Sequence, residues 1–263
     1  MSVSIRLGIV GGAGWLGGAI AGAALAAGVV RAEDLALSYR SAKPDRFPGA
    51  FWTDDNQALA ERSDVIMLSV RSQDWPSLEL DAKGKLVISV MAGIRLAEIS
   101  EKHGTRRVVR TLPNAAAEVA KSYTPWIASS DPIEDDRAIV RAIFDACGVE
   151  DEVGSERDIY YLTGLTGSGP AFPALLADAM VRDAVAFGLA PEVARRAVNT
   201  VLIGTGRLLE LNDAPPADTV EAFLGYRGTT AAAIETMCEA GFDEAVSKGL
   251  AAAFLKSIAM GKA

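Results

Sequence analysis

A short run near the C-terminal end places glycine and hydroxyl residues at a spacing that suits anion binding. Residues 225–230 read Gly-Tyr-Arg-Gly-Thr-Thr and lead into a helical pattern that begins at Ala231. Gly228, Thr229 and Thr230 would offer backbone N–H groups and two hydroxyls at a helix start, where the helix dipole favours negative charge. The run therefore predicts a site for a small carboxylate. The alternative is that Thr229 and Thr230 only cap the helix.

A second chemical pattern lies near the N-terminal end, where glycines follow the apolar run 5–10 and precede an alanine-rich helix that extends to about residue 27. In a G-x-G-x-x-G pattern the first glycine permits a tight turn, the second lets the backbone approach a pyrophosphate, and the third lets the helix pack on the strand. We therefore expect a dinucleotide site here; glycines that serve turn geometry alone are the alternative. The residues expected at this turn are Gly12, Gly14, Trp15, Leu16 and Gly17.

The residues that follow the second expected strand favour NADP over NAD. About 20 residues after the glycines, an NAD-selective site offers Asp or Glu to the ribose hydroxyls. This chain has Ser38, Tyr39, Arg40 and Ser41 there, without a carboxylate to repel a 2′-phosphate. Ser38 and Arg40 are expected to bind that phosphate of NADPH, with NADH as the alternative cofactor. The other interpretation of Arg40 and nearby Lys43 is an ordinary solvated loop.

Residue types that serve as acids in many hydride transfers are scarce. His103 is the only histidine, and its position favours a surface cap at a helix C-terminus, which argues against a histidine-dependent dehydrogenase. Lysine is absent between Lys121 and Lys248, so a general-acid lysine on the first long helices is excluded. Cys147 and Cys238 lack metal-ligand spacing, so we expect no metal and two reduced cysteines packed as small apolar residues.

Reduction of a C=N bond fits this set of residues. An imine nitrogen can arrive already protonated, which makes its carbon electrophilic, so the protein mainly has to orient the hydride donor and the acceptor. A hydroxyl or a water relay near the nitrogen is then enough.

Apolar strands alternate with helices through the first half of the chain. This pattern predicts an α/β fold with a Rossmann-type, doubly wound sheet that is mostly parallel at its start. Thr53 or Asp54 is expected to cap the helix after the third strand. Strands are expected near residues 5–10, 35–38, 50–53, 64–70, 85–90, 108–110, 126–128 and 150–153.

The second half of the chain has helical patterns only. We therefore predict a dinucleotide-binding domain over 1–154 and a helical dimerisation and substrate-binding domain over 155–263, with Ser155 as a helix cap. Helices rich in Ala and Leu are expected to bury their apolar stripes against a second copy. The helical stretches are expected near residues 155–187, 191–211, 216–223, 229–240 and 242–260.

Composition limits the partners. The 263 residues carry a formal charge of −8, which argues against nucleic acid as a partner because phosphate binding needs clustered Lys and Arg. No apolar run approaches the roughly 20 residues of a membrane helix, so no membrane partner is expected. The first strand begins near Ser4, which leaves no room for a signal peptide, and we expect a cytoplasmic protein.

Taken together, these motifs resemble the Δ1-pyrroline-5-carboxylate reductase family over most of the chain. Two motifs are the specific ones: 163–171, Thr-Gly-Leu-Thr-Gly-Ser-Gly-Pro-Ala, and 228–230, Gly-Thr-Thr. The resemblance implies NADPH- or NADH-dependent reduction of a cyclic imino acid to L-proline by a homodimer or higher homo-oligomer. The other motifs in the family's order are the glycine turn, 53–56, 70–73, 92–93 and 112–114.

The resemblance also implies roles for single residues. Thr163 would lie near the imine nitrogen as a hydroxyl donor or water holder, and Gly228, Thr229 and Thr230 would bind the substrate carboxylate from the neighbouring subunit. Thr163 has a plainer alternative, a hydrogen bond back to a helix carbonyl. The remaining residues implied to bind the cofactor are Asn56 near the adenosine ribose, Val70, and Ala92, Gly93, Pro113 and Asn114 on the nicotinamide side.

Three departures from the family pattern bear on substrate identity. Ala115-Ala116 replaces a Thr-Pro pair, Tyr226-Arg227 replaces the usual Ser-Pro, and Arg71-Ser72 stands where Lys and Pro are usual. Arg227 beside the anion site would tighten carboxylate binding or admit a different substrate. Two alternatives stay open: a reductase of another cyclic imine or ketimine carboxylate, and a catalytically silent NADP-binding regulatory protein.

Overall fold

The computed structural model describes residues 5–131, 133–211 and 214–261. Their contacts form two compact units, residues 5–168 with 252–261, and residues 169–251. The predicted domain division after residue 154 stays a prediction; in the structure α5, Glu156–Leu162, packs on β7 of the sheet.

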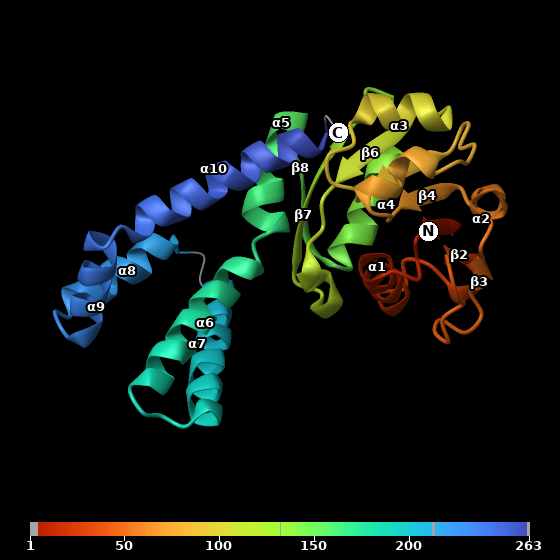
Figure 1. Cartoon of the computed structure of the whole chain (residues 1–263). Coiled ribbons are helices and arrows are strands. Elements are labelled where there is room, and N and C mark those ends of the chain that lie inside the picture. Colours follow the sequence, from red (N-terminus) through yellow and green to blue (C-terminus); the bar gives the residue numbers. More distant parts are fainter. Residues whose placement is uncertain (1–4, 132, 212–213, 262–263) are drawn as a thin grey trace. The chain divides into compact units, whose positions relative to one another are not determined.

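The first unit is built on an eight-stranded sheet in the order β3-β2-β1-β4-β5-β6-β7-β8 (Figure 1). All neighbours are parallel except β6 and β7, so the expected Rossmann-type sheet is confirmed. The chain order reverses between β1 and β4, the point where such sheets bind ligands at the carboxyl ends of their strands. The strands are β1 Leu7–Val10, β2 Leu35–Ser38, β3 Phe51–Thr53, β4 Val65–Leu68, β5 Leu86–Ser89, β6 Val108–Thr111, β7 Ser122–Ala128 and β8 Gly148–Glu152.

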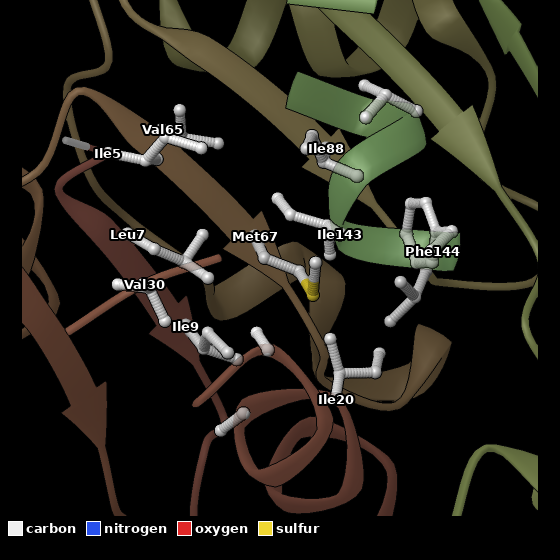
Figure 2. Packing of buried hydrophobic residues seen from close by; sticks show 14 of the residues in the cluster. Ile5, Leu7, Ile9, Ile20, Val30, Val65, Met67, Ile88, Ile143 and Phe144 are labelled. Carbon is white, nitrogen blue, oxygen red and sulfur yellow. The ribbon is translucent and has the colours of Figure 1, made fainter. Parts of the chain in front are cut away.

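Helices cover both faces of this sheet because its central strands are apolar on both sides. Along β4, Val65 and Met67 join one buried cluster and Ile66 and Leu68 join the other, as the two-residue period of a strand requires. Figure 2 shows the first cluster, where Ile20, Ile143 and Phe144 gather with Leu7, Ile9, Met67 and Ile88. The covering helices are α1 Trp15–Ala26 and α4 Glu134–Asp145 on that face, and α2 Asn56–Arg62 and α3 Leu96–His103 on the other.

The described residues of the second unit form helices and the turns between them, with no strand, and α6 packs alongside α7 (Figure 1). Among the residues of this unit that the structure describes, only Ala194, Val198 and Ala231 are buried apolar residues. Phe187 is 86% exposed and Leu211 80%, so most of the apolar surface of these helices is open. The helices are α6 Ala171–Ala186, α7 Pro191–Leu211, α8 Pro216–Gly225, α9 Thr229–Glu239 and α10 Phe242–Met260, of which residues from 252 onward belong to the first unit.

Four local expectations were wrong. Asp55, and not Thr53 or Asp54, caps α2, because its carboxylate accepts hydrogen bonds from the N–H groups of Gln57 and Ala58. The helix expected over 155–187 is divided into α5, a π-helical turn at Thr163–Gly167 and α6, whereas Ser155 caps α5 as expected. His103 is 1% exposed and not at the surface, and Cys238 is exposed while Cys147 is buried.

Candidate functional site

The glycine-rich turn between β1 and α1 leaves the start of α1 open. Gly14 is the N-cap of α1 and no side chain caps the helix, so the first N–H groups are available to an anion. Gly11, directly before the predicted G-x-G-x-x-G pattern, has the positive φ of this turn (+80°). A Cβ on Gly11 would lie 2.3 Å from the carbonyl oxygen of Ser69, so the close approach of β1 to β4 excludes any side chain there.

Arg46, in the loop between β2 and β3, supports this turn. Its Nη2 donates to the carbonyl oxygens of Gly12 (3.0 Å), Ala13 (2.8 Å) and Gly14 (3.3 Å). Gly18 makes room for the guanidinium, since a Cβ there would lie 2.5 Å from Nη1. The carbonyls of the turn are thereby held toward Arg46. Nothing in the sequence pattern indicated this contact, because it depends on the path of a loop 30 residues away.

A cavity of about 930 Å³ opens at the carboxyl ends of β1, β2 and β4. It is lined by seven of the residues expected to bind cofactor: Gly14, Trp15, Leu16, Ser38, Arg40, Asn56 and Val70. Ser38 also accepts a hydrogen bond at Oγ from the N–H of Gly11 (2.9 Å), which ties β2 to the turn. Gly12, Gly17, Ala92, Gly93, Pro113 and Asn114 do not line it.

Charged residues gather on one wall of the cavity. Arg40 Nη2 lies 2.8 Å from Asp74 Oδ2, and Arg71 Nε lies 3.1 Å from the same oxygen. The hydrogen bond from Arg40, with that from Arg71, holds the pKa of Asp74 below its usual value. Asp54 also lines the cavity. Neither carboxylate was among the cofactor residues predicted from the sequence. Asp54 directly follows β3, whereas Asp74 lies in the 3₁₀ turn Ser72–Ser77 beyond β4, a place that no local pattern indicated.

Trp15 makes a second link across the site. Its side chain is 59% exposed, yet its Nε1 donates to Glu118 Oε2 over 3.0 Å. Glu118 belongs to the 3₁₀ turn Ala115–Val119, which contains the two alanines that depart from the family pattern. The glycine turn and the loop after β6 are therefore joined by this hydrogen bond.

Strand β6 and the loop that follows it carry two anchors for the segment that contains Thr163. Arg110 is 1% exposed, and its Nη1 lies 2.8 Å from Glu156 Oε1 at the start of α5. Beyond the strand, Asn114 Nδ2 donates to the carbonyl oxygen of Thr166 over 2.9 Å. Within this segment Thr163 Oγ1 donates to the carbonyl oxygen of Ile159 (2.7 Å), the plainer alternative given above, which leaves its lone pairs able to accept.

Glycines 93 and 164 allow the last turns of α10 to pack on this region. Gly93 has a φ of +87°, and a Cβ on it would lie 2.9 Å from the carbonyl carbon of Met260. A Cβ on Gly164 would lie 2.9 Å from the Cβ of Ala253. Ala92, Gly93 and Pro113 stay predicted cofactor residues, and Gly93 also has this packing role.

The predicted anion site lies in the second unit, at the start of α9. Gly228 is the N-cap, no side chain makes a capping hydrogen bond, and Thr229 and Thr230 are exposed. The hydroxyls are therefore not used to cap the helix. Arg227, directly before it, has a φ of 49°, an uncommon value for a residue with a side chain.

The described part of the chain contains neither a candidate metal centre nor a candidate membrane-spanning helix. Among these residues no group of three or more His, Cys, Asp and Glu side chains is placed to hold a metal ion. None of their helices combines the length and the apolar character that crossing a membrane requires.

The fold and the cavity define the class: a Rossmann-type dinucleotide-binding unit joined to helices. Residues 6–93 match the family described as NADP oxidoreductase, coenzyme F420-dependent, and residues 156–260 match pyrroline-5-carboxylate reductase dimerisation. The chain is 31% identical to the pyrroline-5-carboxylate reductase of Synechocystis over 269 positions, which cover 99% of this chain and 100% of that protein. This chain belongs to the pyrroline-5-carboxylate reductase family.

Solved structures agree with this assignment. The pyrroline-5-carboxylate reductase of Coxiella burnetii superposes with a TM-score of 0.88 at 25% identity, over 99% of this chain and 100% of that one. The pyrroline carboxylate reductase of Plasmodium falciparum, solved with NADP bound, gives 0.84 at 25% identity over 98% of both chains. The dimerisation match and the open apolar helices together indicate a homo-oligomer.

Proposed function

We propose that this chain reduces the C=N bond of Δ1-pyrroline-5-carboxylate to give L-proline, with NADPH as the reductant. The observation that carries the proposal is similarity to enzymes of this name along the whole chain, combined with a cavity at the strand reversal. The small-molecule substrate is a cyclic imino acid. The charge of −8 supports the absence of nucleic acid as a partner, and we place the reaction in the cytoplasm.

The residues of the cavity fit a dinucleotide. The uncapped start of α1 offers N–H groups to a pyrophosphate, and a Cβ on Gly14 would lie 3.0 Å from the carbonyl oxygen of Gly11, so the tight turn leaves little room for a side chain there. Ser38, Arg40 and Asn56 line the end where the adenosine ribose and its 2′-phosphate would lie. When bound, NADPH supplies the hydride.

The chain's own residues bind and orient the imino acid. Gly228, Thr229 and Thr230 bind its carboxylate through N–H and O–H groups at the start of α9. Thr163 lies near the imine nitrogen, where its hydroxyl, which donates its proton to Ile159, accepts a hydrogen bond from a held water or from the protonated nitrogen. Because an iminium carries its own proton, the reaction needs no lysine or histidine acid, in agreement with the place of His103 on the buried side of α3.

A homodimer completes the site. The exposed apolar side chains of α6 and α7 need a cover, and the dimerisation match at 156–260 supports a second copy of this chain as that cover. The partner would contribute its own start of α9 to the site formed around the cavity. Higher assemblies built from such dimers are compatible with this arrangement.

The test is NADPH oxidation against a panel of five- and six-membered cyclic imine carboxylates, repeated with NADH. We expect pyrroline-5-carboxylate to give the highest kcat/KM. A six-membered imine as the better substrate would establish the second candidate, a ketimine reductase, for which the departures from the family pattern at Arg227 and at Ala115-Ala116 are the grounds. Binding of NADPH without turnover of any imine would leave only a regulatory role and would refute the proposal.

A further inference from the structure

Asp74 holds both arginines on the adenosine side of the cavity. Its Oδ2 lies 2.8 Å from Arg40 Nη2 and 3.1 Å from Arg71 Nε, and all three side chains line the same cavity as Ser38. Asp74 is the least exposed of the three, since 23% of its side chain is accessible against 67% for each arginine. The carboxylate is therefore a fixed part of the wall, to which the two arginines are attached.

A 2′-phosphate and this carboxylate compete for the same donors. Arg40 is the residue we assign to the 2′-phosphate, and a phosphate that binds it must share the guanidinium with Asp74 at close range. Two negative groups at one cation repel each other, and this repulsion weakens the binding of NADPH. The ribose of NADH carries a free 2′-hydroxyl and is not repelled by Asp74. A carboxylate is the usual hydrogen-bond acceptor for that hydroxyl.

The acidic residue of an NAD site normally follows the second strand, where this chain has none. Here the carboxylate reaches the corresponding wall from the 3₁₀ turn Ser72–Ser77, which follows β4. We propose that Asp74 is a specificity-determining residue of the cofactor site, which restrains Arg40 and Arg71 and so lowers the preference for NADPH over NADH. This inference rests on the proposed function.

The test is isothermal titration of NADP⁺ and NAD⁺ into the wild type and the Asp74→Asn variant. Asparagine keeps the shape of the side chain and removes its charge, so both arginines become available to the phosphate. We expect the Kd of NADP⁺ to fall roughly three- to tenfold, which is the effect expected of an ion pair that is exposed or partly shielded from solvent. The Kd of NAD⁺ should not fall. Adenosine 2′,5′-bisphosphate and 5′-AMP should show the same contrast, because they differ by the 2′-phosphate.

Asp54→Asn is the matched control. It removes the same charge from the same cavity, but Asp54 is not the residue that bridges Arg40 and Arg71. We expect a change below about twofold in the ratio of the two dissociation constants. Arg40→Glu should have the opposite effect to Asp74→Asn and should weaken the binding of NADP⁺.

Two results would overturn the inference: an unchanged ratio in Asp74→Asn, or an equal shift in Asp54→Asn. In either case wild-type binding of both cofactors would leave the proposed function intact. If the wild type bound neither cofactor, the proposed function and the inference would fail together. Thermal melting of each variant separates loss of the fold from a change in preference.

Discussion

Asn114 joins the loop after β6 to the π-helical turn at Thr163–Gly167, because its Nδ2 donates to the carbonyl oxygen of Thr166 over 2.9 Å. Its Oδ1 accepts from the N–H of Ala116 at the same distance. Both ends of the amide are therefore used within the protein. The side chain sets the position of the segment that carries Thr163, whether or not it also contacts the nicotinamide.

Asn114→Asp should lower kcat by about tenfold or more, because the donor to Thr166 is lost and a carboxylate then faces a carbonyl oxygen. The Kd of NADP⁺ should change by less than about threefold, since the adenosine and pyrophosphate contacts stay in place. Steady-state kinetics and titration of the cofactor measure the two effects. An unchanged kcat in a folded variant would show that Asn114 does not position the reacting groups.

Glu156→Gln should destabilise the fold by about 3 kcal/mol, because the guanidinium of Arg110 is buried and would lose its counter-charge. This value is at the low end for broken buried pairs, since Glu156 is itself 30% exposed. Urea unfolding at a fixed protein concentration measures it. Glu79→Gln, which breaks the exposed pair with Lys102, is the control and should cost less than about 1 kcal/mol. Equal losses would contradict a special role for Arg110.

His103 should titrate below its ordinary pKa of 6.5, because burial disfavours the imidazolium. Its Nδ1 donates to the carbonyl oxygen of Leu80 over 3.0 Å, so the neutral ring carries its proton there. A lowered folded-state pKa means that the stabilising contribution is present above pH 6.5 and is lost as the pH falls through the folded pKa. As the only histidine, its ring protons give one resolved titration by NMR. A pKa above 6.5 would contradict the buried position.

Thr230→Ala should raise the KM of the imino acid about tenfold, the value of one hydrogen bond to a carboxylate, and leave the KM of NADPH unchanged. Thr236→Ala is the matched control on the same helix, because the Thr236 hydroxyl donates to the carbonyl oxygen of Ala232. That variant should keep both KM values within about twofold. Equal kinetics for the wild type and Thr230→Ala would remove the anion site from the account.

Cys147 should resist alkylation in the native protein at pH 8. Burial raises the pKa of its thiol to about 11, so the reactive thiolate is scarce. Because the raised pKa belongs to the folded state, stability should decline as the pH rises from about 9 toward 11. Mass-spectrometric mapping of iodoacetamide adducts should find Cys147 modified only after denaturation. Rapid native modification would contradict the packing.

Local pattern was enough for most of the fold. The strands from β1 to β6 are short, mostly apolar runs of three or four residues, and two of the later helices, α7 and α8, begin at a proline. It was harder to predict which of several neighbouring side chains caps a helix. Thr53, Asp54 and Asp55 all have capping chemistry, and backbone geometry alone decides that Asp55 caps α2.

The site was predictable where a motif is contiguous and not where it depends on long-range contacts. Gly14, Trp15 and Leu16 of the predicted turn line the cavity, whereas Gly12 and Gly17 do not, and Gly11 has the positive φ. Asp74 and Arg46 reach the site from separate loops, and the burial of His103 depends on Leu80 and Trp75, which lie more than 20 residues away. Contacts between residues so far apart in the sequence cannot be predicted from local spacing.

The central claim is a hydride transfer to carbon doubly bonded to nitrogen. The most direct measurement is mass spectrometry and NMR of the product formed from pyrroline-5-carboxylate and NADPH deuterated at its transferable position. We predict L-proline with one deuterium, on the carbon that was doubly bonded to nitrogen in the imine. Undeuterated proline, or no proline from a protein that binds NADP⁺, would contradict it.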